Sequence, residues 1–327
     1  MATPIHPFEA LRPERIVAAI ESLGFEVLGE PFALNSYENR VYAWRDDTQQ
    51  RWVAKFYRPE RWNSAQILEE HAFLAELDRN DVKVGAAWAD DDGKTLHEFE
   101  GFRFTLFRHV IGQAPELDNP AHLFALGELL GHMHSVAGRT AFIDRPSMQP
   151  EAIMTSSRER VLASNWMTLR QRQAYQRISA ALLELIPLPS WPSSHMIRVH
   201  GDCHIGNMLG RDDEFTLVDF DDCCMAPAVQ DIWMLLTAQN EQEWRQQLAE
   251  VLEGYEQYCE FPRSELKWIE ALRTLRLMRH SAWLVDRWDD PAFPVAFPWV
   301  ASEGYWDQHI RTLEQQRHAL ERPPWLA

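Results

Sequence analysis

Two acidic segments lying close together in the chain carry the residue types that phosphoryl transfer requires. The first runs from His200 to Asn207 with the sequence His-Gly-Asp-Cys-His-Ile-Gly-Asn, and it places Asp202 five residues before Asn207. The second places Asp219 at the end of an apolar run, twelve residues further on. Transfer of a phosphoryl group from a nucleotide needs one carboxylate for the proton of the attacking hydroxyl. It also needs hard oxygen ligands for Mg²⁺, which an Asn and a second Asp can supply.

This arrangement, H-G-D-x-x-x-x-N followed by an apolar segment that ends in Asp, resembles that of the kinase-like phosphotransferases. This superfamily includes aminoglycoside phosphotransferases, choline kinases and protein kinases. The resemblance implies that Asp202 is the catalytic base, that Asp219 is catalytic as well, and that Asn207 and Asp219 hold Mg²⁺ against bound ATP. The plainer alternative is that these residues are turn and cap residues between two strands.

The same superfamily requires a lysine on the third strand of a small lobe, paired with a glutamate on a helix. Lys55 lies in the strand-like run Trp52-Val-Ala-Lys-Phe-Tyr57, and of the four lysines in the chain it alone occupies an apolar strand. The resemblance implies that Lys55 contacts the α- and β-phosphates. Adjacent helix residues point about 100° apart, so only one of Glu69 and Glu70 can face the lysine. The spacing to the following Ala-Phe-Leu favours Glu70, with Glu69 on a solvated face.

The loop that would contact the phosphates departs from the protein-kinase pattern. The segment from Leu34 to Tyr42 has the sequence Leu-Asn-Ser-Tyr-Glu-Asn-Arg-Val-Tyr, without a G-x-G-x-x-G motif. Backbone N–H groups and a hydroxyl in such a hairpin can bind phosphate, and Ser36 is the candidate contact. An ordinary polar hairpin explains the segment equally well. The segment Phe104–Val110 is the candidate connector whose backbone would meet adenine.

Several further segments narrow the resemblance to the bacterial stress response kinase A family, over about residues 8 to 325. They are the loop above, Lys55-Phe-Tyr-Arg-Pro-Glu-Arg-Trp62, His200-Gly-Asp-Cys-His204, Pro227-Ala-Val-Gln-Asp-Ile-Trp-Met-Leu235 and Asp290-Pro-Ala-Phe-Pro294. The family consists of Ser/Thr protein kinases with an aminoglycoside-phosphotransferase-like fold. The resemblance implies a cytoplasmic kinase, dependent on ATP and Mg²⁺, that phosphorylates protein Ser or Thr and supports survival under envelope stress.

The elements that must position these residues form two lobes of different character. We predict an α+β, bilobal, protein-kinase-like fold, with a β-rich nucleotide-binding lobe over 1–110 and a mostly helical catalytic and substrate lobe over 111–327. In the first lobe the periodicity predicts helices over 12–23 and 64–77, the second capped by Ser64. Strands are predicted over 25–34, 40–44, 51–57, 84–87, 102–108, 197–199 and 215–218.

Composition limits the functions open to the chain. The chain has 327 residues, is 46% hydrophobic, and carries a formal charge of −17, so we do not expect a general nucleic-acid-binding protein. Neither a secretory signal nor an apolar stretch long enough to span a membrane is evident. Four cysteines are too few for a disulfide framework, and we therefore expect a cytoplasmic protein with reduced thiols. We expect a monomer.

The segment that follows Asp219 bears on regulation. Residues 220–230 contain no Ser, Thr or Tyr, so we predict that phosphorylation there does not switch the enzyme. Asp231 opens an apolar helix, where a carboxylate is favourable, and the resemblance suggests that it supports the catalytic loop. Asp221 is a candidate second metal ligand or a solvated loop acid, and for Asp222 the solvated interpretation is favoured.

Alternatives remain open at this point. His200, Cys203, His204, Cys223 and Cys224 could be assembled into a zinc site, but their spacing suits tetrahedral ligation poorly. Oxidation of Cys203 or Cys223 could inhibit the enzyme, although small buried thiols are the simpler explanation.

The acceptor is the main open question, because the same catalytic residues serve protein kinases and small-alcohol phosphotransferases. Aminosugars, choline and homoserine-like molecules are the small acceptors to consider. A nucleotide-binding pseudokinase scaffold is a third possibility, and the complete residue set argues against it.

Overall fold

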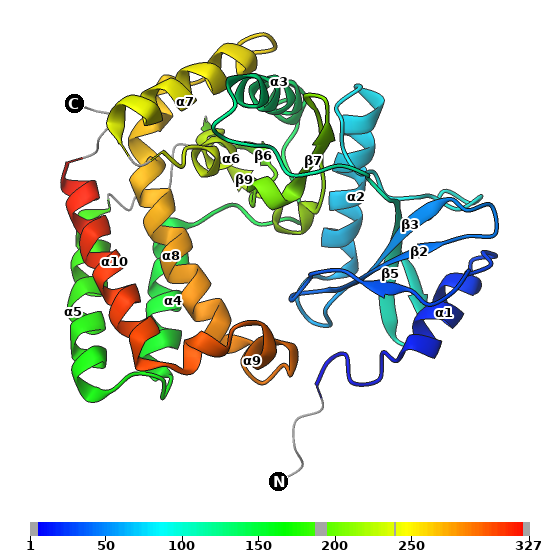
Figure 1. The fold of residues 1–327 in the computed structure, drawn as a ribbon, viewed down its shortest axis with the longest axis horizontal. Coiled ribbons are helices and arrows are strands. Elements are labelled where there is room, and N and C mark those ends of the chain that lie inside the picture. The colour runs from blue at the N-terminus through cyan, green and yellow to red at the C-terminus, as the bar shows by residue number, and fades with distance from the viewer. Residues whose placement is uncertain (1–5, 187–194, 239, 323–327) are drawn as a thin grey trace.

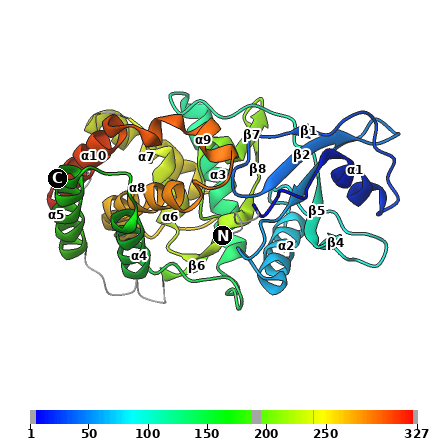
Figure 2. The same cartoon turned by 90° about the horizontal axis from the view of Figure 1, so that it is seen from below.

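A computed structural model describes residues 6–186, 195–238 and 240–322 of the chain. The fold is α+β, with a small lobe built on an antiparallel sheet and a larger lobe that is mostly helical (Figure 1). Figure 1 shows the sheet on the right and α4, α5, α8 and α10 on the left, and the turned view of Figure 2 keeps them apart. The predicted α+β, bilobal arrangement is confirmed.

The sheet of the small lobe has the strand order β1-β2-β3-β5-β4, and each neighbouring pair is antiparallel. The strands are β1 (Phe32–Ala33), β2 (Arg40–Arg45), β3 (Arg51–Phe56), β4 (His97–Phe99) and β5 (Phe102–Arg108). Successive side chains of a strand point to opposite faces. In β3, Trp52, Ala54 and Phe56 therefore pack against helix α1 (Pro13–Glu21), whereas Val53 and Lys55 line a pocket on the other face.

Helix α2 (Ser64–Arg79) begins at the predicted residue, but Ser64 is its first residue and not its cap. Its N-cap is Asn63, not Ser64, because the Asn63 side chain accepts the amide hydrogen of Gln66 while the Gln66 side chain accepts that of Asn63. Such a capping box satisfies two N–H groups that the first helical turn leaves unpaired. The helix also continues two residues past the predicted end at Leu77.

Two predicted strands are much shorter in the structure. The strand expected over 25–34 is reduced to Phe32–Ala33. The segment 84–87 forms only single bridges, of Val84 with Leu217 and of Ala87 with Phe107. Since Leu217 belongs to the large lobe, this apolar segment joins the two lobes instead of extending the sheet.

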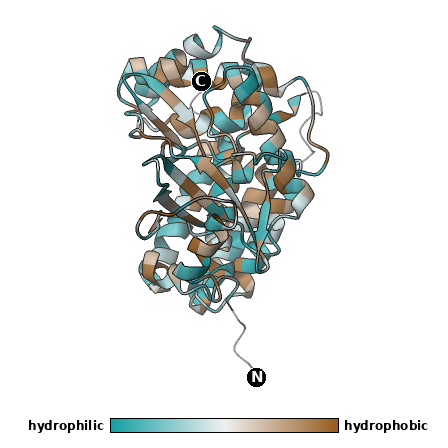
Figure 3. Ribbon diagram, turned by 90° about the vertical axis from the view of Figure 1, so that its right-hand side faces the viewer, coloured by the Kyte–Doolittle hydropathy of each residue, from teal (hydrophilic) through white to brown (hydrophobic). Residues whose placement is uncertain are grey.

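The large lobe combines helices with two small antiparallel sheets of two strands each. One pairs β6 (Ile197–Val199) with β9 (Cys224–Ala226), and the other is a hairpin of β7 (Met208–Arg211) and β8 (Glu214–Leu217), which lies between β6 and β9 in the chain. The helices are α3 (Pro120–Ala137), α4 (Pro150–Ala163), α5 (Leu169–Leu185), α6 (Val229–Ile232), α7 (Glu241–Tyr255), α8 (Ile269–Asp286), α9 (Ala292–Ala296) and α10 (Glu303–Glu321). Hydrophobic and hydrophilic residues alternate along the strands and helices, as expected for elements with one buried face (Figure 3).

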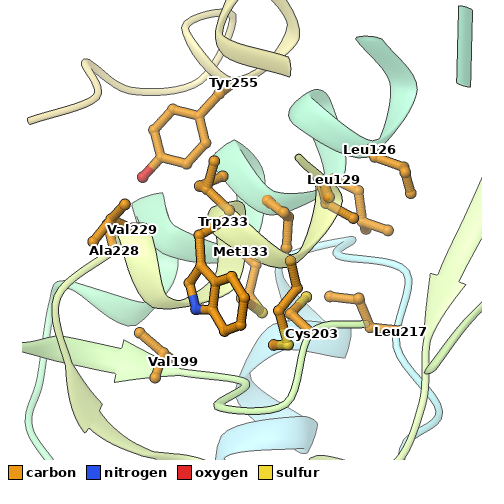
Figure 4. Close-up of a cluster of buried hydrophobic side chains, with 14 of the residues drawn as sticks. Leu126, Leu129, Met133, Val199, Cys203, Leu217, Ala228, Val229, Trp233 and Tyr255 are labelled. Carbon is orange, nitrogen blue, oxygen red and sulfur yellow. The ribbon is translucent and has the colours of Figure 1, made fainter. Parts of the chain in front are cut away.

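The largest hydrophobic cluster connects the lobes and extends under the catalytic loop. It includes Phe73 and Leu74 of α2, Met133 of α3, Leu217 of β8 and Cys203 of the loop over residues 200–207, which is called the catalytic loop. Figure 4 shows Cys203 among buried apolar side chains that include Leu217 and Met133. Burial of the residue next to Asp202 fixes this loop to the core.

No helix within the described residues is long and apolar enough to cross a lipid bilayer.

Candidate active site

A pocket of about 240 Å³ lies between the sheet and the large lobe. Among its lining residues are Ser36 of the loop before β2, Lys55 of β3, Glu70 of α2, and Asp219. Residues 107–110 of the predicted adenine connector line it as well, together with apolar side chains from both lobes: Leu34, Val41, Val53, Leu74, Leu209 and Val218. An apolar slot with a few polar groups at one end is the usual shape of a nucleotide site.

The catalytic loop is held in place by the buried carboxylate of Asp231. Its Oδ2 accepts the backbone N–H of His200 at 2.7 Å, and its Oδ1 accepts that of Gly201 at 2.9 Å. His134 Nε2 lies 3.1 Å from Oδ2, and the other ring nitrogen contacts the Tyr255 hydroxyl at 2.9 Å. Asp231 thus fixes the two residues that precede Asp202, which is the supporting position that the sequence suggested for it.

Gly201 is required by the close approach of two loops. Its φ is +86°, a conformation that L residues with a side chain rarely adopt. A Cβ at this position would lie 2.2 Å from the carbonyl oxygen of Asp222. The glycine therefore lets the catalytic loop pack directly against the segment that follows Asp219.

Lys55 is the centre of a buried ion-pair network. Its Nζ lies 3.0 Å from Asp221, 3.1 Å from Asp219 and 3.6 Å from Glu70. Burial alone would lower the pKa of Lys55, but these carboxylates outweigh it and hold the pKa well above its usual value. The lysine thus keeps its positive charge in the pocket, as a group that contacts phosphate must.

The two neighbouring glutamates of α2 have different partners. Glu70 is buried and faces Lys55, and its other oxygen accepts a hydrogen bond from Arg145. Burial raises the pKa of Glu70, against the effect of its two cations. Glu69 points elsewhere and accepts the backbone N–H groups of Asp144 at 2.9 Å and Arg145 at 2.6 Å. Glu69 is thus not on a free solvated face, because it organises the loop that delivers Arg145.

Of the two proposed metal ligands, Asp219 lines the pocket, and Asn207 lies beside it, where its backbone carbonyl accepts the N–H of Val218 at 3.0 Å. The Asp219 side chain is 52% exposed, and its backbone adopts a left-handed conformation with φ of 60°. The Asn207 amide nitrogen donates to the backbone carbonyl oxygen of Asp202 at 3.0 Å, which orients the side-chain amide of Asn207. An exposed carboxylate and an oriented amide oxygen are a donor set that fits Mg²⁺.

Asp221 and Asp222 are ion-paired and are not solvated loop acids. Asp221 is buried between Lys55 and Arg61, at 3.0 and 2.9 Å. Asp222 lies 3.0 Å from Arg61 and 2.8 Å from Arg279. Burial would raise the pKa of both carboxyls, but the neighbouring cations lower it, to about 2 for Asp221. Both groups remain charged and hold the two lobes together.

The loop that carries Ser36 is anchored to the large lobe. The Ser36 hydroxyl donates to the carbonyl oxygen of Asn39 at 3.3 Å, which orders the turn. Glu38, in the same loop, accepts hydrogen bonds from Trp283 at 2.8 Å and from Arg287 at 2.7 Å. Burial would raise the pKa of Glu38, but these bonds and Arg61 lower it.

A second anchor joins the end of this loop to the segment after α8. The buried Asp290 lies 2.9 Å from Arg40, 2.7 Å from Arg58 and 2.8 Å from His6. Burial opposes ionisation, but the bonds from Arg58 and His6 lower the pKa of Asp290 to about 2. Arg40 and Asp290 are 250 positions apart in the chain.

Sequence reasoning missed four arginines of the site. Arg145 pairs with Glu70, Arg61 with Asp221, Arg276 with Asp202, and Arg279 with Asp222. Arg61 was part of a segment that carried the family resemblance, which was the one available signal. Arg145 is a single arginine in a loop. Arg276 and Arg279 continue a run of arginines at every third position from Arg273, which makes them neighbours on a helix but does not indicate Asp202 or Asp222 as their partners.

The structure bears on the two alternatives based on cysteine and histidine. Within the described residues, no group of three His, Cys, Asp or Glu side chains is arranged to hold a metal ion. The thiols of Cys203 and Cys223 are fully buried, and burial raises their pKa well above the usual value. A buried, protonated thiol is a poor target for oxidants.

The sequence and the fold have clear relatives. Residues 30–269 match the model of the phosphotransferase enzyme family. Stress response kinase A of Escherichia coli K12 is 39% identical over 317 residues, which cover 97% of this chain and 96% of that protein. A protein of Salmonella typhimurium named serine/threonine protein kinase RdoA is 39% identical over 318 residues, with the same coverage.

Solved structures share the fold at low sequence identity. Amicoumacin kinase in complex with AMP-PNP, Ca²⁺ and Ami superposes with a TM-score of 0.70 at 21% identity, covering 96% of this chain and 94% of that one. A microcompartment-associated aminopropanol kinase gives 0.71 at 17% identity, covering 94% and 96%. These likenesses confirm the predicted phosphotransferase-like kinase fold. Together with the sequence matches, they establish that the chain belongs to the phosphotransferase enzyme family and, within it, to the stress response kinase A family.

Proposed function

We propose that the protein is an ATP- and Mg²⁺-dependent kinase that phosphorylates Ser or Thr hydroxyls of proteins in a bacterial stress response. The observation that carries the proposal is the convergence of Lys55, Glu70 and Asp219 in one pocket, with Asp202 and Asn207 on the adjoining loop. The near full-length similarity to a protein named serine/threonine protein kinase supports a protein acceptor.

In this proposal each residue has a distinct task. Lys55, held by Glu70, binds the α- and β-phosphates, and Ser36 with its loop covers them. The Asp202 carboxylate takes the proton of the acceptor hydroxyl while the hydroxyl oxygen bonds to the γ-phosphorus and the bond to the bridging oxygen of ADP breaks. Asn207 and Asp219 would hold Mg²⁺, which would supply positive charge to the phosphate oxygens.

A small-alcohol phosphotransferase is the second candidate. Solved structures with this fold include kinases named for amicoumacin and for aminopropanol, although their identity to this chain is low. A pseudokinase scaffold is disfavoured, because Lys55, Glu70, Asp202, Asn207 and Asp219 are all present.

The test is transfer from γ-labelled ATP with Mg²⁺, first to a generic acceptor protein and then to a panel of small alcohols. Asp202→Asn is the control, and it should lose transfer while it keeps nucleotide binding. Label on Ser or Thr of the protein acceptor is the expected result. Label on small alcohols alone would establish the second candidate, and the absence of any transfer together with retained ATP binding would establish the scaffold.

A further inference from the structure

Helix α8 carries three exposed basic residues in the part next to the catalytic loop. Ahead of Asp286, the exposed residues of this fully described helix are Arg276, Arg279 and His280. The side chains of the two arginines are 44% and 49% exposed. In a chain with a formal charge of −17, two exposed arginines on one helix beside Asp202 are a local concentration of positive side chains, although each is paired with one carboxylate.

These residues lie on the acceptor side of Asp202. Arg276 forms a hydrogen bond with the Asp202 carboxylate, and Arg279 binds Asp222 at 2.8 Å. None of the residues that line the nucleotide pocket in the described part of the chain comes from α8. In an in-line transfer the attacking hydroxyl lies opposite the leaving group, away from the bound nucleotide. The acceptor must therefore reach Asp202 along the side where α8 lies.

The two arginines can bind further anions. A guanidinium has five N–H donors in a planar fork that matches a carboxylate. Among the described residues, Arg276 and Arg279 are each recorded in an ion pair with one carboxylate only. Asp221 and Asp222 are already balanced by Lys55, Arg61 and Arg279, so they offer little to a cationic acceptor.

We propose that Arg276 and Arg279 select the acceptor, and that the acceptor is a protein segment whose Ser or Thr is flanked by Glu or Asp. A substrate carboxylate draws Arg276 away from Asp202, and the freed Asp202 then accepts the proton of the hydroxyl. The arginine thus couples recognition of acidic flanks to release of the base. This inference rests on the proposed protein-kinase function, because it names the class of protein sequence that the site accepts.

The test uses three serine peptides that differ only at the four residues around the serine, which are all Glu, all Gln or all Lys. We expect kcat/KM to be about tenfold higher for the Glu peptide than for the Lys peptide, equivalent to about 1.4 kcal/mol. The preference should weaken as ionic strength rises, because these arginines are partly exposed. Arg279→Gln should reduce the preference and Arg279→Glu should invert it, whereas Arg279→Lys should retain part of it.

A matched control is available on the neighbouring helix. Arg160 of α4 is 48% exposed and pairs with a single carboxylate, that of Asp286, away from Asp202. Arg160→Gln should leave the ratio between the peptides unchanged. Thermal unfolding checks that each variant is folded.

The outcomes separate this inference from the proposed function. Equal use of the three peptides, or an Arg279 variant that slows all three by the same factor, would overturn the inference and leave the protein-kinase function standing. Label on none of the peptides, with label on a small alcohol, would overturn the proposed function and this inference with it.

Discussion

The substitution Asp231→Asn tests whether this residue positions the catalytic loop. Asp231 accepts two backbone N–H groups and faces His134, all inside the protein. An asparagine keeps one acceptor oxygen, so its amide nitrogen must face one of the two N–H donors and leave it unpaired. A buried unpaired donor costs about 1–3 kcal/mol, and we expect a loss of about 2 kcal/mol in the free energy of unfolding.

The effect on catalysis should exceed the effect on stability. The two N–H groups belong to His200 and Gly201, directly before Asp202, so their release lets the base move. A displacement of about 1 Å costs about a hundredfold in rate, and we expect a loss of that size in kcat with little change in ATP affinity. Steady-state kinetics, nucleotide titration and urea unfolding measure the three quantities.

Asp46→Asn is the matched control for this experiment. Asp46 is also a buried aspartate, and it accepts hydrogen bonds from the backbone of Thr48 and Gln50 and from the Trp52 indole, in the turn after β2. Its variant should lose stability and keep kcat. If Asp231→Asn were folded and kept kcat within about threefold of the wild type, while a 1 Å displacement predicts a hundredfold loss, the positioning role would be refuted.

Other predictions follow from the same geometry. Gly201→Ala should abolish transfer and lower the unfolding temperature, because its Cβ would collide with the Asp222 carbonyl; an active, equally stable variant would contradict the close approach. Lys55→Met should lose transfer and also become less stable, because it leaves the buried Glu70 without one of its cations. Calorimetry and an activity assay measure the two effects, and a variant that loses activity at unchanged unfolding temperature would show that Lys55 has no structural role. Because the pKa of Asp290 is depressed to about 2, its contribution to stability is complete above about pH 4, the range of an unfolded carboxyl, and is lost as pH falls toward 2. Asp290→Asn should therefore reduce the loss of unfolding free energy between about pH 4 and pH 2. Urea unfolding at a series of pH values measures this loss, and an equal loss in the variant and the wild type would show that the pKa of Asp290 is not lowered.

Much of the site could be predicted because its residues lie at short, fixed spacings. Asp202 and Asn207 belong to one loop. Helix geometry allowed only one of Glu69 and Glu70 to face Lys55, and the spacing to the following Ala-Phe-Leu favoured Glu70. Site residues that lie close together in the sequence could therefore be identified from the sequence.

What remained hidden depends on contacts between distant segments. Asp290 meets Arg40 across 250 positions, and Arg276 meets Asp202 across 74. The apolar run at 84–87 indicated burial, but its partner, Leu217, lies in the other lobe. The packing of the complete chain determines such pairs, and the hydrophobic periodicity of the sequence does not indicate them.

The anchoring of the Ser36 loop has a consequence for turnover. Glu38 and Asp290 connect this loop to α8 and to the segment that follows α8. The Ser36 loop over the nucleotide pocket therefore cannot move away from the large lobe unless these contacts break. In the proposed kinase, exchange of ADP for ATP then requires these charged contacts of Glu38 and Asp290 to break together. For the proposed kinase we therefore expect product release, and not the chemical step, to limit the rate. Solvent viscosity and salt would then govern its maximal speed.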